Sequence, residues 1–382
     1  MPQGISDFGI LRKENALYVD KTQHIYTIIK SGRYHFLSRP RRFGKSLLLS
    51  TLKEIFSGNK QIFNDLWINQ SDYKWEEYPV LHLDFFAIAR GGIKELQNGL
   101  QRRLQIIGSN FSIDLDPEAP LEEKFETLIR KMAQKNPVVV LIDEYDHAII
   151  NNLHDFNVAN ECRQVLQGFY GVLKSVDAHL RFVFLTGVTK FSKASIFSGL
   201  NNLNDLTMKE YAATLLGYTH QELLNNFESY IQKAAVKLNQ NPAEIVSTMT
   251  EWYNGYQFSD AAEIDGQSVK VYNPWSVLSL FDENKFSNYW FQSGTPRFLI
   301  EVIQQQNFPP IELEKIKVLQ SNIGNFQIDK ISLPVLLYQT GYLTIESYNP
   351  LNRMYTLKMP NKEVEISFFE QLLGVITEAP LQ

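Results

Sequence analysis

The sequence predicts an α/β fold in which a parallel sheet is flanked by helices over the first half of the chain. Apolar runs rich in β-branched and aromatic residues alternate with helical segments at residues 33–38, 80–84, 138–142 and 181–186. The run at 138–142 is continuously apolar, which is typical of a strand buried on both faces. Because parallel strands end at one edge of a sheet, polar residues that follow these runs are expected to meet there.

The composition is that of a globular protein, with 382 residues of which 44% are hydrophobic and 21% charged. The net charge of −5 does not indicate a broadly cationic surface for nucleic acid. Cys162 is the only cysteine, so an intrachain disulfide and a cysteine-based metal cluster are excluded. No signal peptide and no apolar stretch of ~18–20 residues is present, so we expect a cytoplasmic protein without a membrane partner.

A phosphate-binding loop is predicted between the first strand and the helix that follows it. The segment RYHFLSRPRRFGKSLLLSTL, residues 33–52, reads as strand, loop, Gly-Lys-Ser and apolar helix. Backbone N–H groups at such a helix N-terminus converge on a phosphate. We expect Lys45 to reach the β- and γ-phosphates of ATP and the Ser46 hydroxyl to ligate Mg²⁺. The predicted nucleotide contacts are Arg39, Pro40, Arg41, Arg42, Phe43, Gly44, Lys45, Ser46 and Leu47.

This loop departs from the general GxxxxGK[ST] pattern, because Arg39 occupies the first glycine position. Arg39 and Pro40 imply a different entry of the backbone into the loop. A Gly-Lys-Ser triplet alone is also compatible with a basic turn and a solvated Lys45. The strand before it and the apolar helix after it favour the phosphate site.

Polar residues follow the later strands. Asp143 and Glu144 end the run at 138–142, where a P-loop ATPase places an Mg²⁺-shell aspartate and a glutamate that polarises the attacking water. A solvated acidic turn is the alternative. Thr186 ends the run at 181–186 and is predicted to contact the water or the γ-phosphate; Thr189 is the second choice, and capping of the strand end is the alternative.

Several other residues are weaker candidates. Tyr18 and Asp20 could lie near the base, although capping of the helix that begins there is the favoured interpretation. Arg163, Lys190 and Lys193 could contact phosphate, although a solvated side chain is the favoured interpretation of each. Arg297 could reach the nucleotide from the lid.

The chain is predicted to comprise an ATPase domain at 1–204, a helical lid at 205–330, and a winged-helix-like unit with the start of a linker at 331–382. Asn273 and Pro274 should begin a lid helix. In the last unit, a helix from 333 ends at Gly341 and a hairpin follows. The hairpin carries few cations, which favours packing or a protein partner over DNA.

Six segments in order are similar to the predicted AAA-ATPase-like family of bacterial P-loop ATPases, near the archaeal ATPase and STAND groups: YVDKT, SRPRRFGKSLLLSTL, VVVLIDEYD, LTGVTKFSKASIFSGLNNL, WYNGYQF and VYNPW. Arg39 is usual in that family. The resemblance implies ATP and Mg²⁺ binding through Lys45, Ser46 and Asp143, with Glu144 as the hydrolytic residue. Members often continue into a PD-(D/E)XK nuclease-like domain; LKMPNKEVEISFFEQLL resembles the junction, and no nuclease motif follows it here.

The leading hypothesis is therefore a Mg²⁺-dependent ATPase whose turnover drives a conformational or regulatory change. One alternative is a nucleotide-gated binding module with negligible turnover. Another is the ATPase part of a nucleic-acid-processing or defence system, which the net charge does not favour. We expect ATP and a protein partner, and the oligomeric state stays open.

Overall fold

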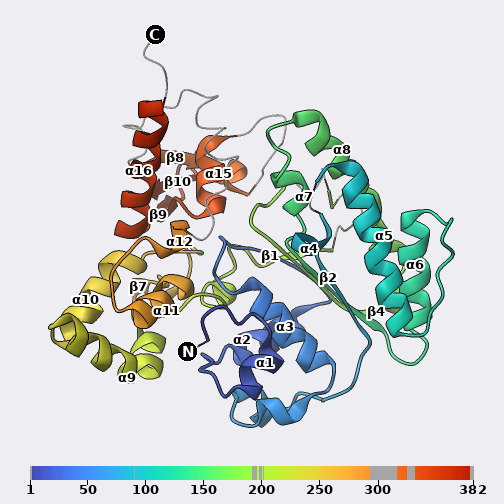
Figure 1. The fold of residues 1–382 in the computed structure, drawn as a ribbon, viewed down its shortest axis with the longest axis horizontal. Helices are drawn as coiled ribbons and strands as arrows, with labels where there is room; N and C mark the ends of the chain where they lie inside the picture. Colours follow the sequence, from blue (N-terminus) through green and yellow to red (C-terminus); the bar gives the residue numbers. More distant parts are fainter. Residues whose placement is uncertain are drawn as a thin grey trace.

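The computed structural model describes residues 2–89, 91–191, 196–197, 200, 202–292, 316–324 and 332–378. Figure 1 shows a sheet with helices on both faces, a helical unit beside it, and a C-terminal unit that lies against both. The predicted class, a parallel sheet flanked by helices, is confirmed.

The main sheet has the strand order β2-β3-β4-β1-β5 and is parallel throughout. Its strands are β1 (Tyr34–Ser38), β2 (Val80–Asp84), β3 (Val138–Asp143), β4 (Leu180–Gly187) and β5 (Asn204–Asp205). All residues of β1 and β3 are buried, as expected for strands covered on both faces. The four predicted strands are thus confirmed, whereas β5 has only two polar residues and gave no periodic signal.

Helices cover the two faces of this sheet in two groups (Figure 1). The first group comprises α1 (Phe8–Lys13), α2 (Thr22–Ser31) and α3 (Lys45–Phe56). The second comprises α4 (Phe85–Ile88), α5 (Ile93–Asn110), α6 (Leu121–Met132), α7 (His147–Ile150) and α8 (Phe156–Ser175). Short 3₁₀ turns lie at Lys60–Phe63, Trp67–Gln70, Asp177–His179 and Glu210–Ala212.

The helical unit has a hydrophobic core of its own, which includes Phe227, Met249 and Leu280. It consists of α9 (His220–Leu238), α10 (Pro242–Tyr253), α11 (Pro274–Glu283), α12 (Tyr289–Gln292) and a small hairpin, β6 (Glu263–Ile264) and β7 (Gln267–Ser268). The side chain of Asn273 accepts a hydrogen bond from the Ser276 N–H, and Pro274 occupies the first turn. The predicted start of this helix is therefore confirmed.

The C-terminal unit contains a three-stranded antiparallel sheet of order β8-β10-β9. Its elements are β8 (Ile316–Leu319), α14 (Gln320–Ile323), α15 (Leu333–Thr340), β9 (Thr344–Asn349), β10 (Met354–Lys358) and α16 (Lys362–Glu378). The predicted helix end at Gly341, whose φ is +95°, and the hairpin are both present. Identification as a winged helix stays a prediction, because residues 293–315 and 325–331 lie outside the described part of the chain.

The three parts share contacts across the predicted domain boundaries. Apolar residues of α15, β9 and β10 belong to the same buried cluster as the main sheet. The boundary predicted at residue 204 falls within β5, which pairs with β1. The domain limits themselves remain predictions.

Candidate functional site

The loop between β1 and α3 enters the helix through a glycine. Gly44 stands at the N-cap of α3 with a φ of +94°, in the left-handed region that favours glycine. Leu48, Leu49 and Leu52 of α3 are buried beneath the sheet. The helix N-terminus is therefore fixed beyond the end of β1, which lies between β4 and β5 in the sheet.

Lys45 is held inside the loop. Its Nζ donates hydrogen bonds to the carbonyl oxygens of Arg39 and Pro40, each at 3.0 Å. Burial lowers the pKa of the ammonium, while the charges of Glu144 and Asp143 oppose that shift. Because the Lys45 side chain is buried, the structure excludes the alternative of a solvated lysine after a basic turn.

Three of the predicted site residues meet around one carboxylate. The Ser46 hydroxyl donates to Asp143 Oδ2 at 2.5 Å, and the Thr186 hydroxyl donates to Asp143 Oδ1 at 2.6 Å. These side chains come from α3, β3 and β4. Thr186 is thus turned toward Asp143, and its contact with a phosphate or with water stays a prediction.

Hydroxyl and carboxylate oxygens are the hard ligands that Mg²⁺ prefers, so Ser46 and Asp143 fit that ion. The described residues contain no group of three or more His, Cys, Asp or Glu side chains able to hold a metal. Two protein ligands, Ser46 and Asp143, are enough for Mg²⁺, because this ion usually keeps several waters and takes further ligands from phosphate.

Glu144 follows Asp143 with an unusual backbone. Its φ is +51°, in the left-handed region, and its N–H donates to Asp143 Oδ1 at 3.0 Å. Burial raises the pKa of Glu144, but the hydrogen bond from His147 and the charges of Lys45 and Arg41 outweigh it. The pKa therefore lies below its ordinary value, and the side chain is a carboxylate at neutral pH.

The next two residues of the DEYD segment fix the chain beyond β4. Asp146 is buried and accepts hydrogen bonds from the N–H groups of Val188 and Thr189 and from the Thr189 hydroxyl. The Tyr145 hydroxyl donates to the Thr189 carbonyl oxygen at 3.0 Å. Thr189, the second choice for a phosphate contact, is thus engaged in holding this segment together.

The Arg39 side chain points into the interior. Its guanidinium donates to the carbonyl oxygens of Ser38, Thr207 and Ala212 at 2.9, 2.7 and 3.0 Å. It also lies 4.1 Å from the centroid of the Phe258 ring. The guanidinium is therefore occupied by contacts within the protein. The predicted contact of Arg39 with a nucleotide stays a prediction, and only the Arg39 backbone is placed to make it.

The rest of the loop is attached to the helical unit by aromatic contacts. The Phe43 ring is buried, with its centroid 4.8 Å from that of Tyr256 and 5.3 Å from that of Phe258. The Arg42 guanidinium lies 4.4 Å from the centroid of the Trp275 ring. Tyr256 and Phe258 are themselves buried, so these rings pack within the protein.

An open cavity of about 530 Å³ lies in front of the loop, within the usual size range of small-molecule sites. Its polar lining includes the loop from Arg41 to Ser46, together with Asp84, Asp143 and Glu144. Its apolar lining includes Leu17, Tyr18, Leu216, Trp275 and Leu278. Leu47 lines it as well, whereas Arg39 and Pro40 line a separate small cavity.

The weaker candidates have other contacts. Tyr18 lines the cavity, but Asp20 accepts hydrogen bonds from the Thr22 and Trp67 N–H groups and so supports the start of α2. Lys190 forms an ion pair with Asp205, and Arg163 donates to Asn160. Lys193 and Arg297 lie outside the described residues.

Sequence reasoning missed two titratable residues at the site. Asp84 ends β2 in register with Asp143 and is half-buried, so burial and the Asp143 charge raise its pKa. The apolar run at 80–83 that ends in this carboxylate was a usable signal, since it repeats the pattern of β3. His147 lies beside Glu144, at the helical spacing of three residues.

No helix in the described part of the chain is long and apolar enough to cross a membrane. The family model described as "Predicted AAA-ATPase" matches residues 2–197. The "Uncharacterized protein in vnfD 5'region" of Azotobacter chroococcum mcd 1 is 36% identical over 379 residues, covering 98% of this chain and 70% of that protein.

Among solved structures, the Aeropyrum pernix ORC2 protein (ADPNP-ADP complexes) is similar with 10% identity and a TM-score of 0.34, covering 94% of this chain and 92% of that one. That likeness is too low to support an inference. The family match and the close relative are sufficient: this chain belongs to the predicted AAA-ATPase family.

Proposed function

We propose that this protein binds ATP with Mg²⁺ and hydrolyses it. The observation that supports the proposal best is the convergence of Lys45 and Ser46 from α3 with Asp143 and Glu144 from the end of β3 on one open cavity. Family membership supports the same reaction class.

In this proposal the Lys45 ammonium exchanges two loop carbonyls for phosphate oxygens and neutralises their charge. Ser46 and Asp143 would hold Mg²⁺, which when bound stabilises the charge that develops on the phosphates. The water oxygen forms a bond to the γ-phosphorus, and the bridging P–O bond breaks with its electrons leaving on ADP. The water proton passes to Glu144, whose lowered pKa keeps it ionised before the reaction.

The apolar part of the cavity is where we place the base and ribose. Tyr18 and its neighbours line it from the N-terminal segment, and Leu216, Trp275 and Leu278 line it from the helical side. An ion pair of 2.6 Å between Lys21 and Glu222 joins these two segments. A bound nucleotide would thus bridge them, so turnover would change how the helical unit docks.

A nucleic-acid function is less well supported. In winged-helix and related DNA-binding modules a helix lies in the major groove with its side chains at the base edges. In the predicted winged-helix-like unit the helix before the hairpin is α15, and six of its consecutive residues, 335–340, are buried. The DNA-reading face would therefore be covered.

ATP binding to the Lys45→Ala variant tests the proposal. We expect calorimetry with Mg²⁺ to show binding by the wild type and by Lys174→Ala, an exposed lysine of α8. Lys45→Ala should weaken binding at least tenfold, because buried phosphate charge loses its counter-charge. Equal affinity of Lys45→Ala and wild type would contradict the proposed site.

A further inference from the structure

The imidazole of His147 lies between Glu144 and Asn151. Its Nδ1 is 3.1 Å from Glu144 Oε2, and its Nε2 is 2.8 Å from Asn151 Nδ2. An amide nitrogen can only donate, so Nε2 accepts and this hydrogen-bond network assigns the ring proton to Nδ1. The Nδ1–H group therefore donates to the Glu144 carboxylate.

The ring is held firmly in this orientation. The His147 side chain is only 9% exposed, and the Phe86 ring packs edge-on against it with centroids 5.3 Å apart. Asn151 caps the C-terminal end of α7, one turn beyond His147, and His147 N donates to the Glu144 carbonyl oxygen at 2.9 Å. Side chain and backbone thus both tie His147 to Glu144.

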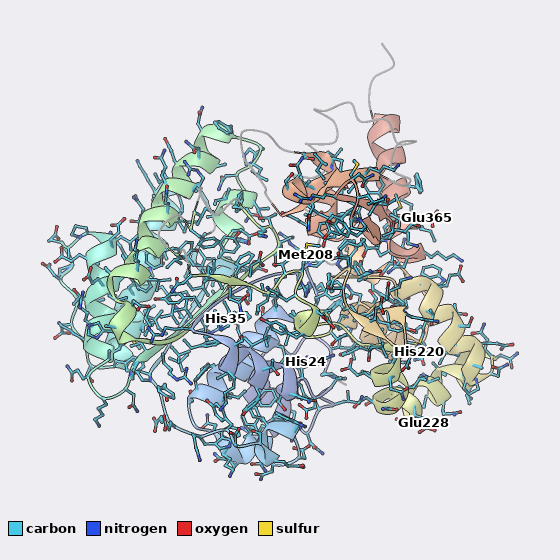
Figure 2. All side chains as sticks on the ribbon, turned by 180° about the vertical axis from the view of Figure 1, so that it is seen from behind. His24, His35, Met208, His220, Glu228 and Glu365 are labelled. Carbon is cyan, nitrogen blue, oxygen red and sulfur yellow. The ribbon has the colours of Figure 1, made fainter. Side chains whose placement is uncertain are left out.

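Other histidines are used differently. His24 contacts the Tyr211 carbonyl oxygen, His35 is buried in β1, and His220 contacts the Tyr272 hydroxyl. Figure 2 labels these three, which lie on α2, on β1 and at the start of α9. Neither these three nor His147 line the cavity; among the four, His147 is the one in contact with Glu144, which does.

The backbone of Glu144 explains why the contact between His147 Nδ1 and Glu144 Oε2 matters. A non-glycine residue at φ +51° is strained by about 1–3 kcal/mol and is retained where the surrounding structure fixes it. Tyr145 N donates to the Thr186 carbonyl oxygen at 2.9 Å, which fixes the chain just after Glu144. With the backbone fixed on either side, the direction of the carboxylate depends on what its side chain contacts.

We propose that His147, oriented by Asn151, is a positioning residue that holds the Glu144 carboxylate by Oε2 and so directs Oε1 toward the attacking water. The proton from water then passes to Oε1, while the Nδ1–H bond to Oε2 persists throughout the step. This inference rests on the proposed ATPase function. Within that function it assigns a role to a residue that neither binds nucleotide nor exchanges a proton.

Two substitutions of similar polarity separate positioning from packing. An asparagine amide nitrogen can take the place of Nδ1, whereas a glutamine amide nitrogen reaches the place of Nε2. We expect His147→Asn to keep kcat for ATP within about fivefold of wild type. We expect His147→Gln and His147→Ala to lose on the order of 10²-fold in kcat, the cost of a misplaced catalytic group. The Kd for ATP should stay unchanged in all three.

The outcomes are distinguishable when turnover, ATP affinity and melting temperature are measured together. If wild type turns over and His147→Gln and His147→Ala keep its kcat, the positioning role is wrong and the ATPase function stands. If His147→Asn loses as much kcat as His147→Ala, the ring serves packing alone and the inference is also overturned. If wild type binds ATP without turnover, the proposed function fails and the inference fails with it.

Discussion

Arg39 occupies the position at the start of the proposed phosphate loop where the general pattern has a glycine. Its guanidinium is fully buried, and burial lowers its pKa to about 10, which leaves it charged at neutral pH. Its three carbonyl partners lie in β1 and in the segment after β5. The arginine therefore supports the loop from behind, where a glycine would leave those carbonyl oxygens without this donor.

We expect Arg39→Ala to lower the free energy of unfolding by at least about 2 kcal/mol, because each buried carbonyl that loses its donor costs about 1–3 kcal/mol. The free energy of unfolding of Arg39→Lys should lie between those of wild type and Arg39→Ala, because an ammonium lacks the planar fork that reaches three acceptors. Urea denaturation measures this, with exposed Arg102→Ala of α5 as the control. An Arg39→Ala variant whose free energy of unfolding lies within about 0.5 kcal/mol of wild type, as for an ordinary surface substitution, would contradict the anchoring role.

At the level of single residues, the sequence predicted which residues lie at the site better than it predicted which side chains touch one another. That Lys45, Ser46, Asp143 and Glu144 lie around one cavity was predictable, because each follows a strand in a pattern with a known chemical reason. The contact of Thr186 with Asp143 was not, because the register of two strands decides which side chains meet. His147 could be suspected only from its spacing to Glu144.

Among the elements, α16 is joined to α11 and α12 by one buried acid. Glu363 accepts hydrogen bonds from the Ser276 hydroxyl and the Trp290 N–H, each at 2.8 Å. Burial raises the pKa of Glu363 to about 8, although those donors act in the opposite direction. The folded protein thus keeps a proton on Glu363 at neutral pH.

This proton predicts a pH-dependent stability. Between about pH 4.5 and 8 the unfolded chain releases the Glu363 proton and the folded chain retains it, so stability falls as pH rises. Between pH 5 and 8 we expect the free energy of unfolding of wild type to fall by a few kcal/mol more than that of Glu363→Gln, because each pKa unit corresponds to about 1.4 kcal/mol.

Urea denaturation at the two pH values measures this difference. Glu365→Gln, an exposed neighbour on α16 that Figure 2 labels, is the matched control and should follow wild type. A wild type and a Glu363→Gln variant with parallel pH profiles would show that Glu363 is ionised in the folded protein.

Long strands and capped helices were predictable because local pattern and burial agree there. The four apolar runs became β1 to β4, and the Asn-Pro pair began α11. By contrast, β5 and β8 have two and four residues and are defined by their pairing with β1 and β10. Such strands depend on partners that are distant in sequence, which no local periodicity reports.

In the whole molecule, the proposed phosphate loop lies where all three parts meet. Arg42 stacks on Trp275 of α11, and Trp290 Nε1 donates to the Arg41 carbonyl oxygen at 3.1 Å. A side chain at Gly341 would approach Pro40 to 2.7 Å, so α15 ends directly against the loop. These contacts span more than 200 residues of sequence, and sequence patterns alone could not place them.

This arrangement explains how a small change at the loop could reach both other units. Movement of the Arg41 backbone would displace Trp290 of α12, whose indole donates to the Arg41 carbonyl oxygen. Movement at Arg42 would displace Trp275 of α11, which lies against its guanidinium. Nucleotide binding and the docking of the helical and C-terminal units are therefore expected to be coupled.

Single-turnover release of γ-phosphate tests most directly whether Glu144 activates water for ATP hydrolysis, as we propose. Wild type, Glu144→Gln and the exposed control Glu118→Gln would be compared with Mg²⁺ and saturating ATP. We predict that Glu144→Gln binds ATP like wild type and hydrolyses it at least about 10²-fold more slowly, while Glu118→Gln is unchanged. Hydrolysis by Glu144→Gln at the wild-type rate, or ATP binding by wild type with no phosphate release, would contradict the account.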